Sequence, residues 1–137
     1  TKKIKQQHLK RDSERSRVLG DVYKRQARKS VRAVHMSEQV EEYLVQIVLA
    51  TRNSDKYGGD LNNWLEYGAS PRATIALDVC SKALAWLNNK DFVSPDDIRS
   101  VAHDILRHRI ILSFEAEANG VSSDQVIDEL LRVVPSA

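Results

Sequence analysis

The residues of this chain whose types and spacing could do chemistry lie in the string GASPRA, residues 68–73. Ser is a strong helix N-cap and Pro fits the first helical position, so we predict a helix with Ser70 as N-cap, Pro71 at N1 and Arg72 at N2. The first turn lies at the positive end of the helix dipole, where a cation is mildly unfavourable. Arg72 is therefore either tolerated surface charge or part of an anion site, because a helix N-terminus with a guanidinium suits phosphate.

Other side chains with possible chemistry are better explained by structure. Cys80 falls within an apolar stripe, which predicts a buried structural thiol, and a single cysteine suits a reducing compartment. Asp96 and Asp97 suit the first turn of a helix. His103 and His108 are five residues apart, whereas two histidines on a helix share a metal when they are four apart. We predict no metal site.

Apolar periodicity predicts four helices, over residues 37–52, 71–87, 94–106 and 122–134. The second has apolar residues on two faces, which predicts a central helix packed on both sides. Residues 53–67 form a long loop, and alternating residues in 109–117 predict a short extended segment. Arg107 and Arg109 follow the third helix, where cations are favoured, so a role at the helix end or at an interface is expected rather than phosphate contact. The fold class is therefore all-α, a small bundle of about four helices.

The N-terminal segment differs from the rest in charge. Residues 1–32 hold 12 Lys and Arg against 3 acids, whereas residues 33–137 hold 9 against 16. A basic tail normally suggests contact with nucleic acid or an acidic membrane. The string DVYKRQ, residues 21–26, however, looks like the translated end of a transposon used in preparing sequencing libraries. We therefore predict an artefactual or disordered basic segment over 1–26 and one helical domain over 27–137.

The motifs of several enzyme classes are missing from the sequence. It has no phosphate-binding loop of the form GxxxxGK[ST], no GxGxxG, no GxSxG and no CxxC, so we expect no catalysis by this chain alone. It has no apolar run long enough for a membrane span and no signal-peptide pattern, which favours a cytoplasmic protein. Thr1 in place of Met suggests a fragment.

Taken together, several strings resemble the C-terminal lid domain of the MoxR family of AAA+ ATPases. They are HMSEQV with the following helix to ATR (50–52), GASPRA (68–73), DFVSPDDI (91–98) and LRHRI (106–110). The order of GASPRA before VSPDDI and LRHR makes the resemblance specific, whereas any one of these strings alone would be weak evidence for the family. The resemblance covers residues 34–135, nearly all of the chain outside the basic segment 1–26.

The resemblance implies a helical lid packed on a nucleotide-binding core, with the arginine after Ser-Pro as sensor 2, which reaches the γ-phosphate of ATP. Arg72 matches that position, with Ser70 and Pro71 beside it in the cofactor-binding motif. ATP and Mg²⁺ are then expected in the complete protein, and neither is bound stably by this chain. The family further implies hexameric rings and chaperone-like remodelling, often of proteins with a von Willebrand factor A domain.

Two other classes of function remain open on the residues alone. A DNA-binding helical domain would explain the basic tail, but residues 33–137 are acidic, which opposes contact with nucleic acid. A free-standing helical interaction module would explain the helices and leave GASPRA without a role. A phosphate-binding loop upstream of this chain would decide for the ATPase.

Overall fold

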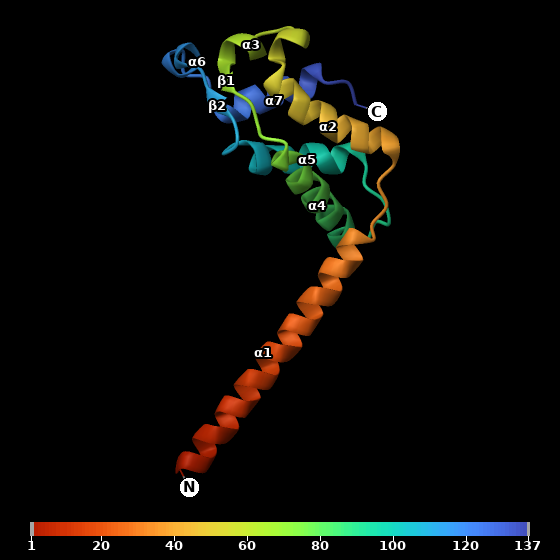
Figure 1. Ribbon diagram of the computed structural model, residues 1–137, viewed down its shortest axis with the longest axis vertical. Helices are drawn as coiled ribbons and strands as arrows, with labels where there is room; N and C mark the ends of the chain where they lie inside the picture. The colour runs from red at the N-terminus through yellow and green to blue at the C-terminus, as the bar shows by residue number, and fades with distance from the viewer. Residues whose placement is uncertain (1, 137) are drawn as a thin grey trace. The chain divides into compact units, whose positions relative to one another are not determined.

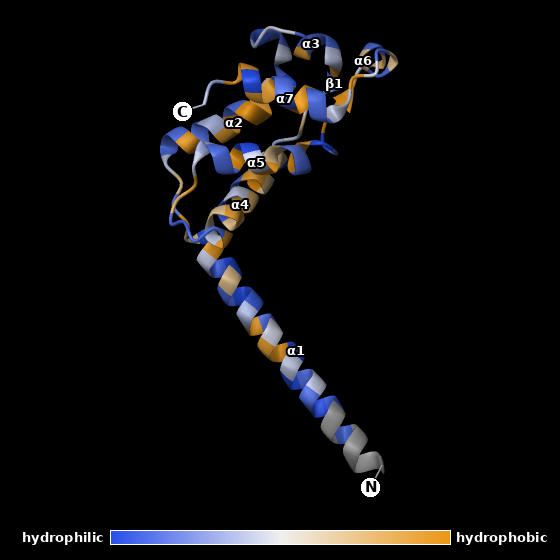
Figure 2. Ribbon diagram, turned by 180° about the vertical axis from the view of Figure 1, so that it is seen from behind, coloured by the Kyte–Doolittle hydropathy of each residue, from blue (hydrophilic) through white to orange (hydrophobic). Residues whose placement is uncertain are grey.

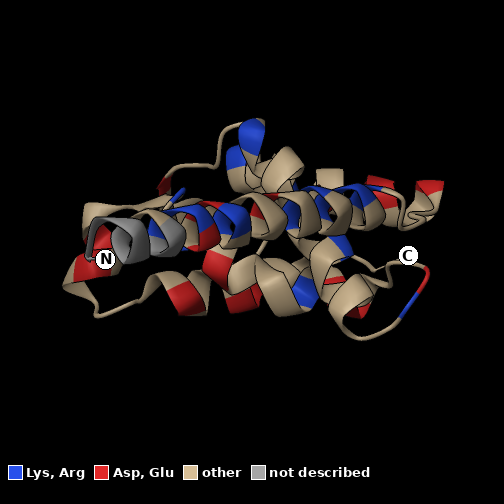
Figure 3. Cartoon of the chain, turned by 90° about the horizontal axis from the view of Figure 1, so that it is seen from below, with Lys and Arg blue, Asp and Glu red and all other residues tan. Residues whose placement is uncertain are grey.

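The computed structural model describes the backbone of residues 2–136 and the side chains of residue 7 and residues 10–136. The chain divides into two units, Thr1–Ala33 and Val34–Ala137. The first unit is one helix, α1 (Lys2–Arg32) (Figure 1). Polar and basic residues cover most of its length (Figures 2 and 3). We predicted an artefactual or disordered segment over 1–26; the structure has a helix from Lys2 onward, and the foreign origin of the segment stays a prediction. The physical reason for the helix is local propensity, because Lys, Arg, Gln and Glu are good helix formers and the segment contains no proline.

A chain that begins at Ala27 tests whether residues 1–26 belong to the folded domain. Every residue of the hydrophobic core lies at or after Val34, so we expect the shortened chain to unfold at the same temperature as the full chain. Thermal unfolding followed by circular dichroism measures this. A fall of several degrees would show that the segment packs on the domain, and the interpretation of a foreign join would be wrong.

The second unit is built from four long helices, which confirms the all-α prediction. The N-caps of three of them, Ser37, Ser94 and Ser122, are the serines expected from the sequence, and Asn89 closes one helix with a positive φ of 55°. The helices are α2 (Glu38–Arg52), α4 (Arg72–Leu87), α5 (Pro95–Leu106) and α7 (Ser123–Val133) (Figure 1).

Short elements fill the segments between these helices. The predicted loop 53–67 contains η1 (Ser54–Lys56), α3 (Leu61–Trp64) and β1 (Leu65–Tyr67). The extended segment predicted over 109–117 is shorter than expected, because only β2 (Ile111–Leu112) is a strand and α6 (Phe114–Ala118) follows at once. Strands β1 and β2 pair antiparallel, with Leu65 opposite Leu112. This pairing holds the loop 53–67 against the residues that follow α5.

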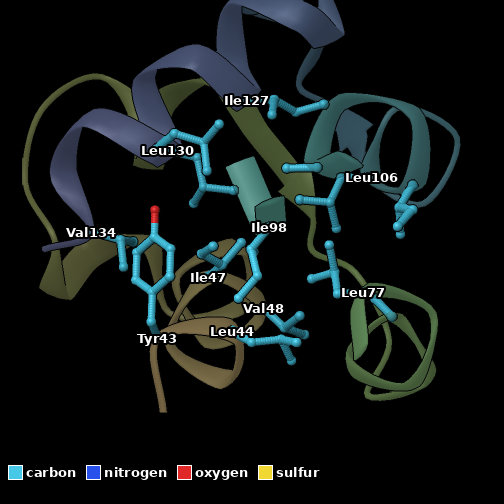
Figure 4. Packing of buried hydrophobic residues seen from close by; sticks show 14 of the residues in the cluster. Tyr43, Leu44, Ile47, Val48, Leu77, Ile98, Leu106, Ile127, Leu130 and Val134 are labelled. Atoms are coloured by element: carbon cyan, nitrogen blue, oxygen red, sulfur yellow. The ribbon is translucent and has the colours of Figure 1, made fainter. Parts of the chain in front are cut away.

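The hydrophobic core lies where α2, α4, α5 and α7 meet (Figure 4). Ile47, Leu77 and Ile98 are fully buried, one from each of three helices, and Ile127 adds the fourth. A buried aliphatic side chain of this size contributes about 1.5–3 kcal/mol relative to exposure. Burial of these side chains therefore holds the four helices in one arrangement, in which the position of α4 is fixed.

Helix α4 is packed on one side, not on both as we predicted. Its buried residues recur every four positions, and the second apolar stripe faces outward, with Ile75 65% and Val79 43% exposed. Cys80 is exposed too, so the expectation of a buried thiol was wrong. Periodicity locates apolar faces on a helix, but the number of neighbouring helices decides which of them are covered. The buried set is Ala73, Leu77, Ser81 and Ala85.

The start of α5 contains a nearly buried carboxylate. Asp97 is 6% exposed and accepts hydrogen bonds from the Ser94 backbone N–H at 2.9 Å and from Lys90 Nζ at 2.6 Å. Burial acts to raise the pKa of Asp97, but the hydrogen bonds from Lys90 and Ser94 outweigh it, and the pKa is lowered from its ordinary value. The ionised carboxylate is therefore the form that stabilises the folded domain.

We expect Asp97→Ala to lower the free energy of unfolding at neutral pH by about 2–3 kcal/mol, because it removes a charged hydrogen-bond centre and half of the capping box. Since the folded pKa lies below 3.8, the contribution of Asp97 is complete above that pH and is lost as the pH falls further. Urea unfolding at neutral pH and below pH 3.8 measures both effects. The exposed neighbour Asp96→Ala is the control; an equal loss in both variants would contradict the assignment.

Candidate functional site

Arg72 is the first residue of α4 and its side chain is exposed. No ion pair or side-chain hydrogen bond of Arg72 is found among the side chains that the structure describes, residues 7 and 10–136. Within that range, the first turn of α4 also lacks an acid, whereas α2, α5 and α7 each have one or two. The N-terminus of α4 therefore presents the positive end of a helix and a guanidinium together, which is an arrangement suited to an anion.

The serine and proline before Arg72 adopt the start of a helix in a different way from the prediction. The N-cap is Pro71, with φ −55° and ψ −22°, and no side-chain hydrogen bond caps the helix. The prediction of Ser70 as the capping hydroxyl was therefore wrong; Ser70 instead accepts at its backbone oxygen from the Ala73 N–H at 2.9 Å. Proline already has a helical φ, so the turn forms around it and the helix begins one residue later.

The residues on either side of Ser70-Pro71-Arg72 are anchored in the domain. Ala69 and Ala73 are both fully buried, and Gly68 lies against the last turn of α2. A Cβ at Gly68 would stand 2.2 Å from the Thr51 carbonyl oxygen, closer than real side chains come to a backbone atom. Nothing in the strings ATR and GASPRA predicts that they touch, because contacts between distant segments leave no mark in local spacing.

The other candidate residues have structural partners. Arg107, at the end of α5, donates from Nε to Asp124 Oδ1 of α7 at 2.7 Å and from Nη1 to Asp104 at 3.2 Å. The hydrogen bonds that Arg107 donates to Asp124 and Asp104 raise the pKa of Arg107. His103 of α5 also contacts α7: its Nε2 lies 2.7 Å from Oδ1 of Asp128. The expectation of a helix-end role for Arg107 thus fits its contacts, which join α5 to α7.

Arg109 is half-buried and its backbone N–H donates to the Leu106 carbonyl at 2.8 Å. Its Nε is buried without a hydrogen-bond partner among the described residues. Among residues 7 and 10–136, no group of three or more His, Cys, Asp or Glu is placed to hold a metal ion. The helices of residues 2–136 include none that is both long and apolar enough to cross a bilayer.

Comparisons with known proteins give the geometry a context. A family profile described as AAA lid domain matches residues 62–130, half of the chain, from α3 to α7. The matched segment includes the GASPRA string and Arg72.

Among curated proteins, Chaperone MoxR1 of Mycobacterium tuberculosis is 37% identical over 94 residues, which cover 68% of this chain and 25% of that protein. Protein MoxR of Paracoccus denitrificans is 32% identical over 84 residues, 58% of this chain and 25% of that protein. Among solved structures, a Cytophaga hutchinsonii protein described as a "putative ATPase" shares 45% identity and a TM-score of 0.76, covering 80% of this chain and 33% of that one. The chain spans a quarter to a third of the length of these relatives.

Proposed function

Because the chain belongs to the AAA lid domain family, we propose that it is the nucleotide-sensing lid of a MoxR-type AAA+ ATPase, with Arg72 as the residue that contacts the γ-phosphate of ATP. The observation that carries this proposal is Arg72 itself. Its guanidinium is exposed at the N-terminus of α4 and has no protein partner among the described residues, while Ala69 and Ala73 on either side are buried. A fixed backbone that presents a cation suits a phosphate brought by another part of the protein.

The residues around Arg72 fit the terminal phosphate of a nucleotide. The first turn of α4 has no acid that would repel the phosphate or neutralise Arg72, and the positive end of the helix dipole favours an anion. When bound, ATP supplies the phosphoanhydride that breaks, and Mg²⁺ neutralises part of its charge. Arg72 stabilises charge on the γ-phosphate oxygens, and its position on a lid makes the lid angle depend on the nucleotide.

A second surface supports contact with the rest of the ATPase. The exposed apolar residues of α4 begin one turn after Arg72 with Ile75 and continue through Val79 to Trp86 and Leu87, the last of which is 68% exposed. Large exposed apolar side chains gathered on one helix often mark an interface. We assign this stripe to the nucleotide-binding core, so that the contact holding the lid also brings Arg72 to the phosphate. Figure 2 shows apolar colour along α4.

The wider role follows from the relatives. The name Chaperone MoxR1 supports chaperone-like remodelling of partner proteins, driven by ATP hydrolysis. We extend to this chain the family's hexameric ring, in which the lid also meets a neighbouring subunit, and the von Willebrand factor A domain as a client type. The exposed thiol of Cys80 suits a reducing compartment, so we place the complete ATPase in the cytoplasm.

The test replaces the matching third of the Cytophaga hutchinsonii protein with residues 34–137, and we call the product the lid-exchanged ATPase. We expect it to hydrolyse ATP with Mg²⁺ at a rate close to that of the unmodified protein, whereas the protein without a lid does not. The 137-residue chain alone should neither hydrolyse ATP nor bind it at micromolar concentration in calorimetry. A lid-exchanged ATPase that folds and binds ATP without hydrolysing it, beside an active unmodified protein, would contradict the proposal.

A further inference from the structure

The end of α2 and the start of α4 are joined by a contact that the proposed function does not use. Residues 68–69, before the Ser-Pro pair, lie against the last turn of α2, where Gly68 leaves no room for a side chain. Ala69 is fully buried in this contact. Both polar backbone groups of a buried residue need partners, because an unpaired group out of water is costly.

Thr51 and Arg52 supply both partners. The Ala69 N–H donates to Thr51 Oγ1 at 2.9 Å, and Arg52 Nη1 donates to the Ala69 carbonyl oxygen at 3.3 Å. The Thr51 hydroxyl in turn donates to the Val48 carbonyl at 2.6 Å, and Thr51 is only 3% exposed. Its acceptor lone pair is therefore aimed at the Ala69 N–H by a hydrogen bond within α2. Two adjacent side chains at the end of one helix hold one residue of the loop.

The backbone between Ala69 and Arg72 has little remaining freedom. Pro71 has a ring-locked φ of −55°, and the Ser70 carbonyl accepts from the Ala73 N–H at 2.9 Å. Ala73 is fully buried on the far side of Arg72. The Cα of Arg72 is thus fixed between two buried alanines, and one of these is held by the end of α2. A shift of Ala69 is transmitted to the base of the Arg72 side chain.

We propose that Thr51 and Arg52 are positioning residues for Arg72, so that the last turn of α2 sets where the guanidinium meets the nucleotide. This inference rests on the proposed function of Arg72. The contact would make the end of α2 and the start of α4 move together within the lid. A displacement of 1 Å at a reacting group is enough to change a rate about 100-fold. A shift of Ala69, three residues before Arg72, would therefore lower the rate of hydrolysis.

The first experiment uses the 137-residue chain and Thr51→Val, which keeps the shape and removes the acceptor. We expect amide exchange at Ala69, followed by NMR, to become at least about tenfold faster, with a fall of only a few degrees in melting temperature. Thr51→Ser should restore protection. Ser81→Ala removes another buried hydroxyl, on α4 away from this loop, and should leave Ala69 unchanged. Unchanged exchange at Ala69 in Thr51→Val would overturn the contact itself.

The second experiment measures kcat and KM in the lid-exchanged ATPase. We expect Thr51→Val to lower kcat about 10- to 100-fold and Thr51→Ser to restore it. In an Arg72→Ala background the same change should have less than about a twofold effect, because positioning acts only through Arg72. Arg52→Ala, at an exposed site, gives a second variant should Thr51→Val fold poorly; Arg132→Ala, an exposed arginine on α7, is its control.

The outcomes separate this inference from the proposed function. If Arg72→Ala leaves hydrolysis unchanged, the proposed function is wrong, and the amide exchange alone reports on the contact. If Arg72→Ala lowers kcat but neither Thr51→Val nor Arg52→Ala does, the positioning role is overturned while the sensor role stands. An equal effect of Thr51→Val with and without Arg72 would show a general structural role and would also overturn it.

Discussion

In the lid-exchanged ATPase, Arg72→Ala is expected to lower the rate of ATP hydrolysis by one to three orders of magnitude at saturating ATP and Mg²⁺. The reason is the loss of one charged contact to the γ-phosphate in the transition state, which costs about 2–4 kcal/mol. Folding should be nearly unchanged, because Arg72 is exposed and makes no ion pair among the described residues. Steady-state kinetics and thermal unfolding of the same preparations measure the two effects.

Two variants make this prediction specific. Arg72→Lys should restore little activity, because an ammonium cannot reproduce the planar two-pronged contact of a guanidinium. Ser70→Ala is the neighbouring comparison: its hydroxyl does not cap α4 in the structure, so stability should change little, and turnover should fall less than in Arg72→Ala. Wild-type turnover in Arg72→Ala would remove the sensor assignment and leave Arg72 an ordinary surface residue.

The second large effect is expected at Gly68, where Gly68→Ala should lower the free energy of unfolding by about 3 kcal/mol. The added Cβ would stand 2.2 Å from the Thr51 carbonyl oxygen and 2.8 Å from the Arg52 nitrogen. Both are backbone atoms of α2 and cannot rotate away as a side chain would. For a domain of this size the loss corresponds to a fall of about 15 °C in melting temperature, measured by calorimetry.

The control for this substitution is the same change in open space. Gly20→Ala lies in α1, where a Cβ meets nothing within 4 Å, and alanine is the better helix former by about 1 kcal/mol. We therefore expect no loss of stability there. A Gly68→Ala chain that unfolds at the wild-type temperature would show that α2 and the loop separate easily, and the rigid connection to Arg72 would be lost with it.

The four long helices and most of their ends can be predicted from the amino-acid sequence alone. Ser37, Ser94 and Ser122 cap their helices as predicted, and the box between Ser94 and Asp97 forms. These features are readable because a cap involves residues three apart, and an apolar stripe repeats with the turn of the helix. Arg72 was located in the same way, since the Ser-Pro pair marks the start of α4 to within one residue.

Which surfaces are covered, and what holds Arg72 in place, depends instead on how the helices pack in three dimensions. The two apolar stripes of α4 look alike in the sequence, yet one meets α5 and α2 in the core and the other, with Ile75, is exposed, as is Cys80. Thr51 and Ala69 are 18 residues apart, and nothing in either string predicts their hydrogen bond. Burial and long-range pairing depend on how many neighbours a helix face meets in three dimensions, which local spacing does not encode.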